Sequence, residues 1–432
     1  DRDESMSRRS KTRLSEVSGR AFWGLGDQVF SSATNFAVNI LVARTLGASS
    51  FGAFSIAFGA YVIFLNLSRA ITSEPLSIRF SNVSEEEWAK GARQASGVSL
   101  ALGVVGGLIC VAVAWILDGD LSAAFFALGV MLPGLLHFDI WRFAFFARGK
   151  GRLAMASDVL WAVVMFPALA WVLSTPEPSL FLIALTWGAS ATIATIIVVS
   201  LWGVPPLFGN LRQWLTDHRD LTPSFVGEMA TVSVAAQLSL VGIGIVANLA
   251  AVGAYRAMYV LFGPLRVVYQ GLTLFGIPEA VRILDMSPQL LRKTTRRVSL
   301  ILAGVALAFG SVLIFMPDSW GRFILGETWT LAEPLTLPFT LGVVGIGLSM
   351  PTYIGLRVLE AAKDAFRTRL VIAGGDVVVT VVGAAAGGAV GAAWAGRSFL
   401  LLGSGLWWRS YDRRLSERER ARPAERVATD GS

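Results

Sequence analysis

Two arginines within an apolar stretch at 253–280 are the residues of this chain whose types and spacing most suggest a binding site. Arg256 and Arg266 share one helical face with Tyr259 and Gln270. Arg256 lies near the end of the stretch, where its side chain can reach the headgroup region, whereas Arg266 lies at the middle. A buried guanidinium can bind a phosphate group through two parallel hydrogen bonds, or it can pair with a carboxylate as a structural element. The sequence supports both interpretations equally.

The apolar stretch at 21–45 carries a second set of polar residues on one broad helical face. It includes Asp27, Asn35 and Asn39. A helix that faced lipid would not hold such a stripe, so this face is expected to point into the protein interior. Amide and small side chains can also join helices to one another. We favour the lining of a polar cavity over that simpler role.

Several further charges lie in apolar stretches at positions that predict ion pairs. In an antiparallel pair of helices, residues equally far from the connecting turn lie at the same depth, and buried charges pair with one another. Three pairs are predicted on this basis: Asp27 with Arg69, Arg142 with Asp158, and Asp376 with Arg397. We expect the second and third pairs to be structural, and the first to have a functional role.

The elements that must position these residues are membrane-spanning helices. The chain is 54% hydrophobic and 16% charged, with a mean hydropathy of +0.60, whereas soluble domains carry about a quarter charged residues. A spanning helix needs about 20 apolar residues. Twelve are predicted, at 21–45, 51–72, 94–117, 121–147, 152–173, 179–202, 226–250, 253–280, 297–316, 332–356, 366–386 and 388–408.

The loop charges predict the topology, because cytoplasmic loops of membrane proteins are rich in Lys and Arg. Basic residues occur in every second loop and in both terminal segments, which places both termini in the cytoplasm. The predicted organisation is a disordered cytoplasmic tail at 1–20, a six-helix bundle at 21–203, an amphipathic cytoplasmic linker at 204–225, a second six-helix bundle at 226–408 and a charged cytoplasmic tail at 409–432.

An internal repeat supports the division into two bundles. The segment Phe51–Phe54 matches Val252–Tyr255 at an offset of 201 residues, and Asp27 matches Glu228 at the same offset. With six helices in each half, the repeats enter the membrane from the same side. They are therefore related by a pseudo-two-fold axis along the membrane normal, with a substrate path expected at their interface. Asp27 and Glu228 are candidates for coupling to protons or sodium ions, or for gating.

The sequence argues against enzymes and against soluble binding proteins. It contains no phosphate-binding loop ending in Gly-Lys-Ser/Thr, no His-Glu-x-x-His and no Gly-x-Ser-x-Gly. One cysteine, Cys110, and two histidines do not suffice for a structural zinc site, so no metal or cofactor is predicted. The net charge of +7 indicates topology and contact with anionic membrane lipids rather than nucleic acid.

The opening hairpin resembles a family of polysaccharide flippases. The passage from Ala43-Arg44 through Leu46-Gly47 to Phe51-Gly52-Ala53-Phe54 is similar to Wzx-type proteins of the multidrug/oligosaccharidyl-lipid/polysaccharide exporter superfamily. The motif covers about 60 residues, and the rest of the chain agrees in length, helix number and two-half organisation. This resemblance implies a bacterial inner-membrane transporter that moves undecaprenyl-diphosphate-linked oligosaccharide from the inner to the outer leaflet.

The resemblance also implies site residues and partners. The family has a cationic central cavity, so Arg69, Arg256 and Arg266 are expected to hold the diphosphate of a polyprenyl-linked glycan. Amides and aromatics of the first and eighth helices are expected to contact sugars. These are Asn35, Asn39, Tyr259 and Gln270. A polysaccharide polymerase and glycosyltransferases are expected partners of such a flippase.

Four alternatives compete with this interpretation. A cation-coupled multidrug exporter of the same superfamily would centre its cavity on carboxylates. A major-facilitator transporter also has twelve spans, but its Asp-Arg-x-Gly-Arg signature is absent from 72–94. A membrane glycosyltransferase or polymerase would need a large external loop, which the sequence lacks. A non-transport component of a polysaccharide assembly complex would not need charged residues facing a cavity.

Overall fold

The computed structural model of the chain consists of helices joined by short turns in the residues that it describes. It describes the backbone of residues 2–176, 178–205, 211–229 and 233–429. It describes the side chains of residues 26–420 apart from 28, 177, 206–210, 228, 230–232, 270 and 273–275. No strand occurs in these parts of the chain, so the predicted all-α class is confirmed.

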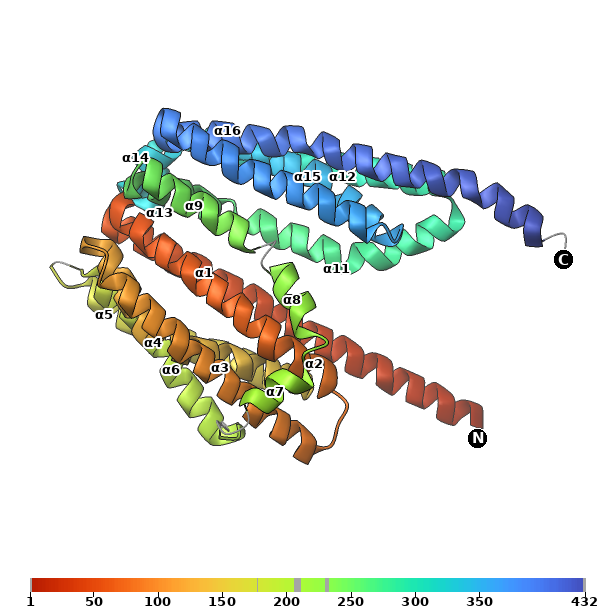
Figure 1. The fold of residues 1–432 in the computed structure, drawn as a ribbon, viewed down its shortest axis with the longest axis horizontal. Coiled ribbons are helices and arrows are strands. Elements are labelled where there is room, and N and C mark those ends of the chain that lie inside the picture. The colour runs from red at the N-terminus through yellow and green to blue at the C-terminus, as the bar shows by residue number, and fades with distance from the viewer. Residues whose placement is uncertain (1, 177, 206–210, 230–232, 430–432) are drawn as a thin grey trace. The chain divides into compact units, whose positions relative to one another are not determined.

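The helices form two compact units (Figure 1). The first unit comprises Asp1–Leu46 and Ala53–Val234, and the second comprises Gly47–Gly52 and Ala235–Ser432. The chain therefore passes from the first unit to the second and back within a single hairpin. The main division falls after the predicted linker at 204–225, because the helix that follows the linker packs with the first unit.

The first unit begins with a very long helix that bends at Gly47. Gly47 has a φ of 73°, a backbone conformation that glycine adopts without steric cost, and it joins two predicted spans into one hairpin. The elements of this part of the chain are α1 (Arg2–Ser68), a π-helical turn (Arg69–Ser73), α2 (Glu74–Arg79), α3 (Glu85–Ala114), α4 (Gly119–Ala147), α5 (Gly151–Leu173), α6 (Leu180–Trp202), α7 (Leu211–Asp217) and α8 (Thr222–Met229).

The second unit ends with a long helix that bends in the same way, at Gly387 and Gly388. Its elements are α9 (Ala235–Val246), α10 (Leu249–Leu261), α11 (Gly263–Met286), α12 (Pro288–Ile314), α13 (Asp318–Leu325), α14 (Thr328–Ala332), a 3₁₀ turn (Glu333–Leu335), α15 (Thr336–Val358) and α16 (Ala362–Thr429).

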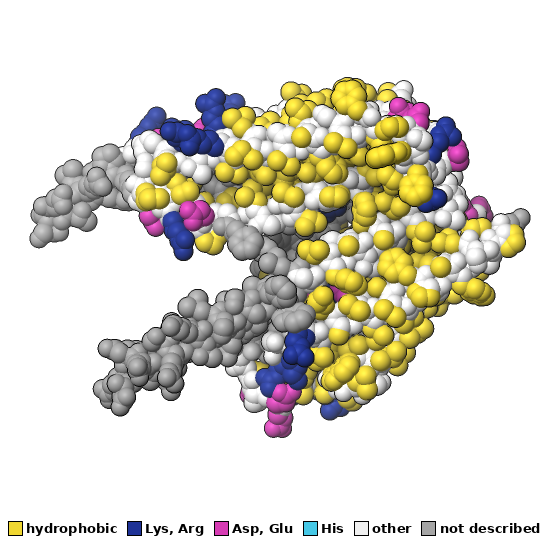
Figure 2. Space-filling model, turned by 180° about the vertical axis from the view of Figure 1, so that it is seen from behind, with side chains coloured by type: hydrophobic (Ala, Val, Ile, Leu, Met, Phe, Trp, Pro, Cys, Tyr) yellow, Lys and Arg dark blue, Asp and Glu magenta, His cyan; other side chains and the backbone are white. Residues whose placement is uncertain are grey.

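Eight helices among the described residues are long and apolar enough to cross a membrane. Two of them, in α1 and α16, fold back at their glycine bends and each accounts for two predicted spans. Of the remaining two predicted spans, one covers α8 and α9, and the other is divided at Phe262 into α10 and α11. Hydrophobic side chains cover the middle of the visible helices, and charged side chains gather near their ends (Figure 2). The chain is a multi-pass membrane protein with the predicted layout of two six-span bundles.

The linker helix α7 docks on the first unit through one buried tryptophan. The indole Nε1 of Trp214 donates a hydrogen bond to the carbonyl of Ile71 at 2.9 Å, and its ring stacks on Phe80. His218 packs on the same indole, and burial lowers the pKa of its imidazole. Helix α7 therefore buries Trp214 against the first unit, and the amphipathic character of the whole linker stays a prediction.

Both terminal segments that were predicted to be disordered are helical where the structure describes them. Helix α1 begins at Arg2, and α16 continues to Thr429. The prediction was wrong for α16 because Tyr411 and Leu415 are buried against the second unit, and Arg414 pairs with Asp364. Charge runs therefore signalled exposure correctly but did not signal disorder.

A close crossing within the second unit follows the predicted repeat. A methyl group on Gly52 would collide with the carbonyl oxygen of Leu249, and a methyl group on Gly253 would collide with that of Ala48. The two contacts are equivalent under the offset of 201 residues that relates the matched segments. Only glycine allows the backbones to approach this closely, as at other membrane-helix crossings.

The turn between α15 and α16 places a glutamate in the left-handed region. Glu360 has a φ of 55°, the amide of Ala361 donates to Leu356 at 2.9 Å, and the amide of Glu360 donates to Arg357 at 3.1 Å. These two bonds close the C-terminal end of α15. Glycine usually occupies the position that Glu360 takes in such a helix end.

We expect Glu360→Gly to stabilise the protein by about 0.5–1 kcal/mol, because glycine adopts this conformation without strain. Thermal unfolding of the detergent-purified chain measures the effect as a higher midpoint. Glu360→Ala, which removes the same charge but keeps Cβ, serves as the control. An equal gain for both variants would show that charge, and not backbone strain, is responsible.

Candidate functional site

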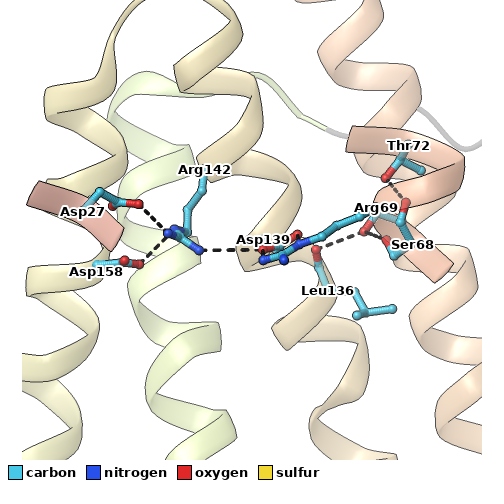
Figure 3. Close-up of polar contacts among 9 residues, drawn as sticks. Asp27, Ser68, Arg69, Thr72, Leu136, Asp139, Arg142 and Asp158 are labelled. Carbon is cyan, nitrogen blue, oxygen red and sulfur yellow. Dashed lines mark hydrogen bonds and ion pairs between the residues drawn. The ribbon is translucent and has the colours of Figure 1, made fainter. Parts of the chain in front are cut away.

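Three aspartates surround the guanidinium of Arg142 inside the first unit (Figure 3). Arg142 projects from α4, and its Nη2 lies 2.5 Å from Oδ2 of Asp27 on α1. Its Nε lies 3.1 Å from Oδ1 of Asp158 on α5, and its Nη1 lies 3.7 Å from Oδ1 of Asp139, one turn earlier on α4. Both Asp27 and Asp158 are buried. One arginine therefore ties three helices together.

Arg69 extends this network from the other side of α4. Its Nε and Nη2 donate to the two carboxylate oxygens of Asp139, at 2.9 and 2.6 Å. Such a two-pronged pair is strong and fixes both side chains. Arg69 is 31% exposed, whereas Asp139 is 6% exposed, so Arg69 forms the open end of the network.

The observed pairing partly corrects the sequence interpretation. Arg142 and Asp158 are paired as predicted, but Asp27 binds Arg142 rather than Arg69. Equal depth in a hairpin does not decide which way a side chain points around its helix. Arg69 begins a π-helical turn, which rotates the following residues relative to a regular α-helix, and it faces Asp139 instead.

The two asparagines of α1 use part of their hydrogen-bonding capacity within the helix. The amide nitrogen of Asn35 donates to the carbonyl of Ser31 at 2.9 Å, and that of Asn39 donates to the carbonyl of Asn35 at 2.8 Å. The Oδ1 atom of Asn39 is buried and accepts no hydrogen bond from the described residues. Their predicted role in contacting sugars stays a prediction.

The second unit contains a different arginine, enclosed by aromatic rings. The Nη2 of Arg397 donates to the hydroxyl of Tyr255 at 2.7 Å and lies 3.5 Å from Oδ2 of Asp376. Its Cζ lies 5.3 Å from the ring centroid of Tyr259 and 5.1 Å from that of Phe339. The predicted pair of Asp376 and Arg397 is present, and Tyr259 belongs to its surroundings.

Two arginines lie on the helices that flank the break between α10 and α11. Arg256 on α10 lies close enough to Arg266 on α11 for their charges to repel each other. Arg266 is exposed, and no carboxylate of the described residues pairs with it. The side chains of Gln270 and Glu228, both predicted site residues, lie outside the described part of the chain.

Sequence reasoning missed the residue that links the two arginines of the first unit. Asp139 lies in an apolar stretch three residues before Arg142, so helical periodicity alone could have placed both on one face. The π-helical turn at Arg69 has no comparable signal in the sequence. The direction of the Arg69 side chain toward Asp139 became visible only with the structure.

Comparison with known proteins identifies the fold. No family model matches the chain, and no curated protein sequence matches it. An inward-facing multidrug resistance transporter of the MATE family, in the MOP superfamily, is similar with a TM-score of 0.68 and 13% identity, over 90% of this chain and 96% of that one.

Two further solved structures share this architecture. The lipid II flippase MurJ, in an inward closed conformation, matches with a TM-score of 0.60 and 12% identity, over 91% of this chain and 89% of that one. A MOP superfamily transporter from Pyrococcus furiosus matches with a TM-score of 0.56 and 12% identity, over 93% of this chain and 95% of that one. The chain therefore has the fold that transporters of the MOP superfamily share.

Proposed function

We propose that this protein is a transporter that flips undecaprenyl-diphosphate-linked oligosaccharide from the inner to the outer leaflet by alternating access. The observation that carries the proposal is the electrostatic proximity of Arg256, on the apolar helix α10, to the exposed Arg266 near the start of α11. An exposed guanidinium in such a position is costly against lipid tails and calls for a polar environment. Two adjacent guanidiniums suit a diphosphate, whose oxygens accept several charge-assisted hydrogen bonds.

One of the comparisons supports this class of substrate. One structure with the same fold is a flippase for lipid II. In our proposal the lipid tail of the substrate stays in the bilayer while the headgroup crosses through the protein. No covalent bond is made or broken, so the chain acts as a transporter and not as an enzyme. Tyr259, Gln270, Asn35 and Asn39 would contact sugars.

The buried network of the first unit suggests how transport is driven. Three aspartates face two arginines, which leaves one formal negative charge in excess among the described residues of the network. A buried excess charge is expensive unless a proton or a cation neutralises it. We therefore propose coupling to protons or sodium ions through Asp27 and its neighbours, with Glu228 as a second candidate.

The same carboxylates favour the alternative of a cation-coupled multidrug exporter. Several solved structures with this fold are MATE transporters. The exporter would use the excess carboxylate for drug and cation exchange, and Arg266 would not contact its substrate.

We place either transporter in the bacterial inner membrane, with both termini cytoplasmic. A polysaccharide polymerase and glycosyltransferases are the partners proposed for the flippase.

Arg266→Ala tests the diphosphate-binding role. Loss of a charge-assisted hydrogen bond, worth about 1.5–3 kcal/mol, should reduce flipping roughly 10- to 100-fold. We would measure the leaflet distribution of lipid-linked oligosaccharide in cells that lack the chromosomal gene and carry each variant at equal protein level. The expected result is accumulation on the cytoplasmic leaflet.

Arg282→Ala is the matched control, because Arg282 is also exposed on the same helix but pairs with Glu279. It should restore normal distribution. Normal export of the glycan in cells that carry Arg266→Ala would show that Arg266 does not bind the diphosphate. Unchanged export in cells without the gene, together with increased sensitivity to cationic drugs, would instead support the exporter.

A further inference from the structure

We propose that the junction of α15 and α16 forms a binding site for the phosphate group of an anionic phospholipid. Two arginines from different helices meet there on one aromatic ring. The Cζ of Arg357, in the last turn of α15, lies 5.9 Å from the ring centroid of Tyr353. The Cζ of Arg369, near the start of α16, lies 4.6 Å from the same centroid. The proposal does not depend on the transport function above.

The two guanidiniums have no anionic partner in the described part of the chain. The nearby carboxylate of Asp364 is already occupied, because Arg413 and Arg414 both pair with it. No ion pair or side-chain hydrogen bond among the described residues reaches Arg357 or Arg369. Two like charges held at one ring repel each other, so an anion between them would be favourable. A phosphate group can accept hydrogen bonds from both guanidiniums at once.

The position of the aromatic ring that both arginines contact is fixed by its surroundings. Tyr353 packs edge-on against the indole of Trp407, with ring centroids 5.7 Å apart. Trp407 belongs to the buried core of this end of the second unit. The turn between the helices is closed by the backbone bonds around Glu360. The site is therefore largely preformed, which lowers the entropic cost of binding a ligand.

Exposed apolar side chains beside the arginines point to a lipid rather than to a free phosphate. Phe366 and Leu370 are 51% and 52% exposed and lie one turn apart on α16, next to Arg369. Acyl chains can pack on this strip while the headgroup phosphate contacts the arginines. Exposed Lys363 and Arg367 add positive charge at the same end of the helix. Basic residues beside an apolar surface are typical of anionic-lipid recognition.

The experiment measures lipid binding to the full-length chain in detergent by native mass spectrometry. The probes are phosphatidylglycerol, phosphatidylcholine, undecaprenyl diphosphate and inorganic diphosphate. The test variant is Arg357→Gln/Arg369→Gln. The matched control is Lys363→Gln/Arg367→Gln, which removes the same charge from the same end of α16 but leaves the arginines on Tyr353 intact.

We expect the test variant to bind phosphatidylglycerol about 30-fold more weakly than the unchanged chain, since direct charge-assisted hydrogen bonding to the phosphate contributes about 2 kcal/mol. The control variant should lose about threefold or less, and phosphatidylcholine should bind weakly throughout. If undecaprenyl diphosphate shows the same dependence and binds more tightly than phosphatidylglycerol, the site still recognises a lipid phosphate and its source is the polyprenyl carrier.

Two results would overturn the proposal. An equal loss in the test and control variants would show general electrostatic attraction instead of a site. The second result is that inorganic diphosphate displaces phosphatidylglycerol when both are present at the concentration at which phosphatidylglycerol binds. That result would show that the lipid part is not recognised. If the glutamine variant does not fold, Arg357→Lys/Arg369→Lys keeps the charge but removes the two-pronged geometry, and it should still bind several-fold more weakly.

Discussion

Arg142→Met is expected to lower the free energy of unfolding by about 3–5 kcal/mol, the largest effect of any single substitution proposed for this protein. The substitution leaves Asp27 and Asp158 without their positive partner in a buried site. Breaking a buried pair by removing one charge is strongly destabilising, because the remaining charge keeps its desolvation penalty. Asp139 would retain its two-pronged bond to Arg69, so part of the network would survive.

The measurement is thermal unfolding of the detergent-purified chain, with the yield of folded protein as a second readout. Arg148→Met is the matched control at the end of the same helix. Its partner Glu85 is 60% exposed, so the loss should stay below about 1 kcal/mol. Equal midpoints for the two variants would show that the Arg142 network does not stabilise the first unit.

A compensating variant separates lost charge from lost packing. Arg142→Met/Asp27→Asn/Asp158→Asn removes the guanidinium together with the two carboxylates that it neutralises. We expect it to recover a large part of the stability, because a neutral buried cluster avoids uncompensated charge. If the triple variant is as unstable as Arg142→Met alone, the loss arises from packing around the aliphatic part of Arg142.

Gly253→Ala is the second substitution with a large expected effect, about 2–3 kcal/mol of destabilisation. The added methyl group would overlap the carbonyl of Ala48, which is a backbone atom and cannot rotate away as a side chain can. The two backbone segments must therefore separate, and overpacking of this kind is costly. Gly52→Ala should have a similar effect, because it meets the carbonyl of Leu249 in the equivalent way.

Thermal unfolding again gives the measurement, and the double variant gives the sharpest test. Once one methyl group has separated the segments, the second adds little, so the combined loss should be clearly smaller than the sum. Gly374→Ala is the control. It lies within α16 with no atom near the added methyl group, and it should stabilise by roughly 0.5–1 kcal/mol. Additive losses at Gly52 and Gly253 would show that the two contacts are independent.

The candidate site could be predicted in part. Apolar stretches identified Arg142, Asp158, Asp376 and Arg397 as buried charges, because a charged residue in a spanning helix needs a partner. The choice between partners at similar depth could not be predicted. It depends on helix rotation, and the π-helical turn at Arg69 changes that rotation by an amount that no sequence pattern reports.

The amino-acid sequence by itself determined that this chain spans a membrane with helices in two six-span halves. Its hydropathy is sufficient for this, because an apolar solvent requires every backbone polar group to be satisfied within a helix. The tertiary structure alone decided that Asp139 connects Arg69 to Arg142, that Arg397 is enclosed by aromatic rings, and that Arg357 and Arg369 meet on Tyr353. These contacts join helices far apart in the chain, and their geometry depends on packing between helices, which local sequence patterns do not specify.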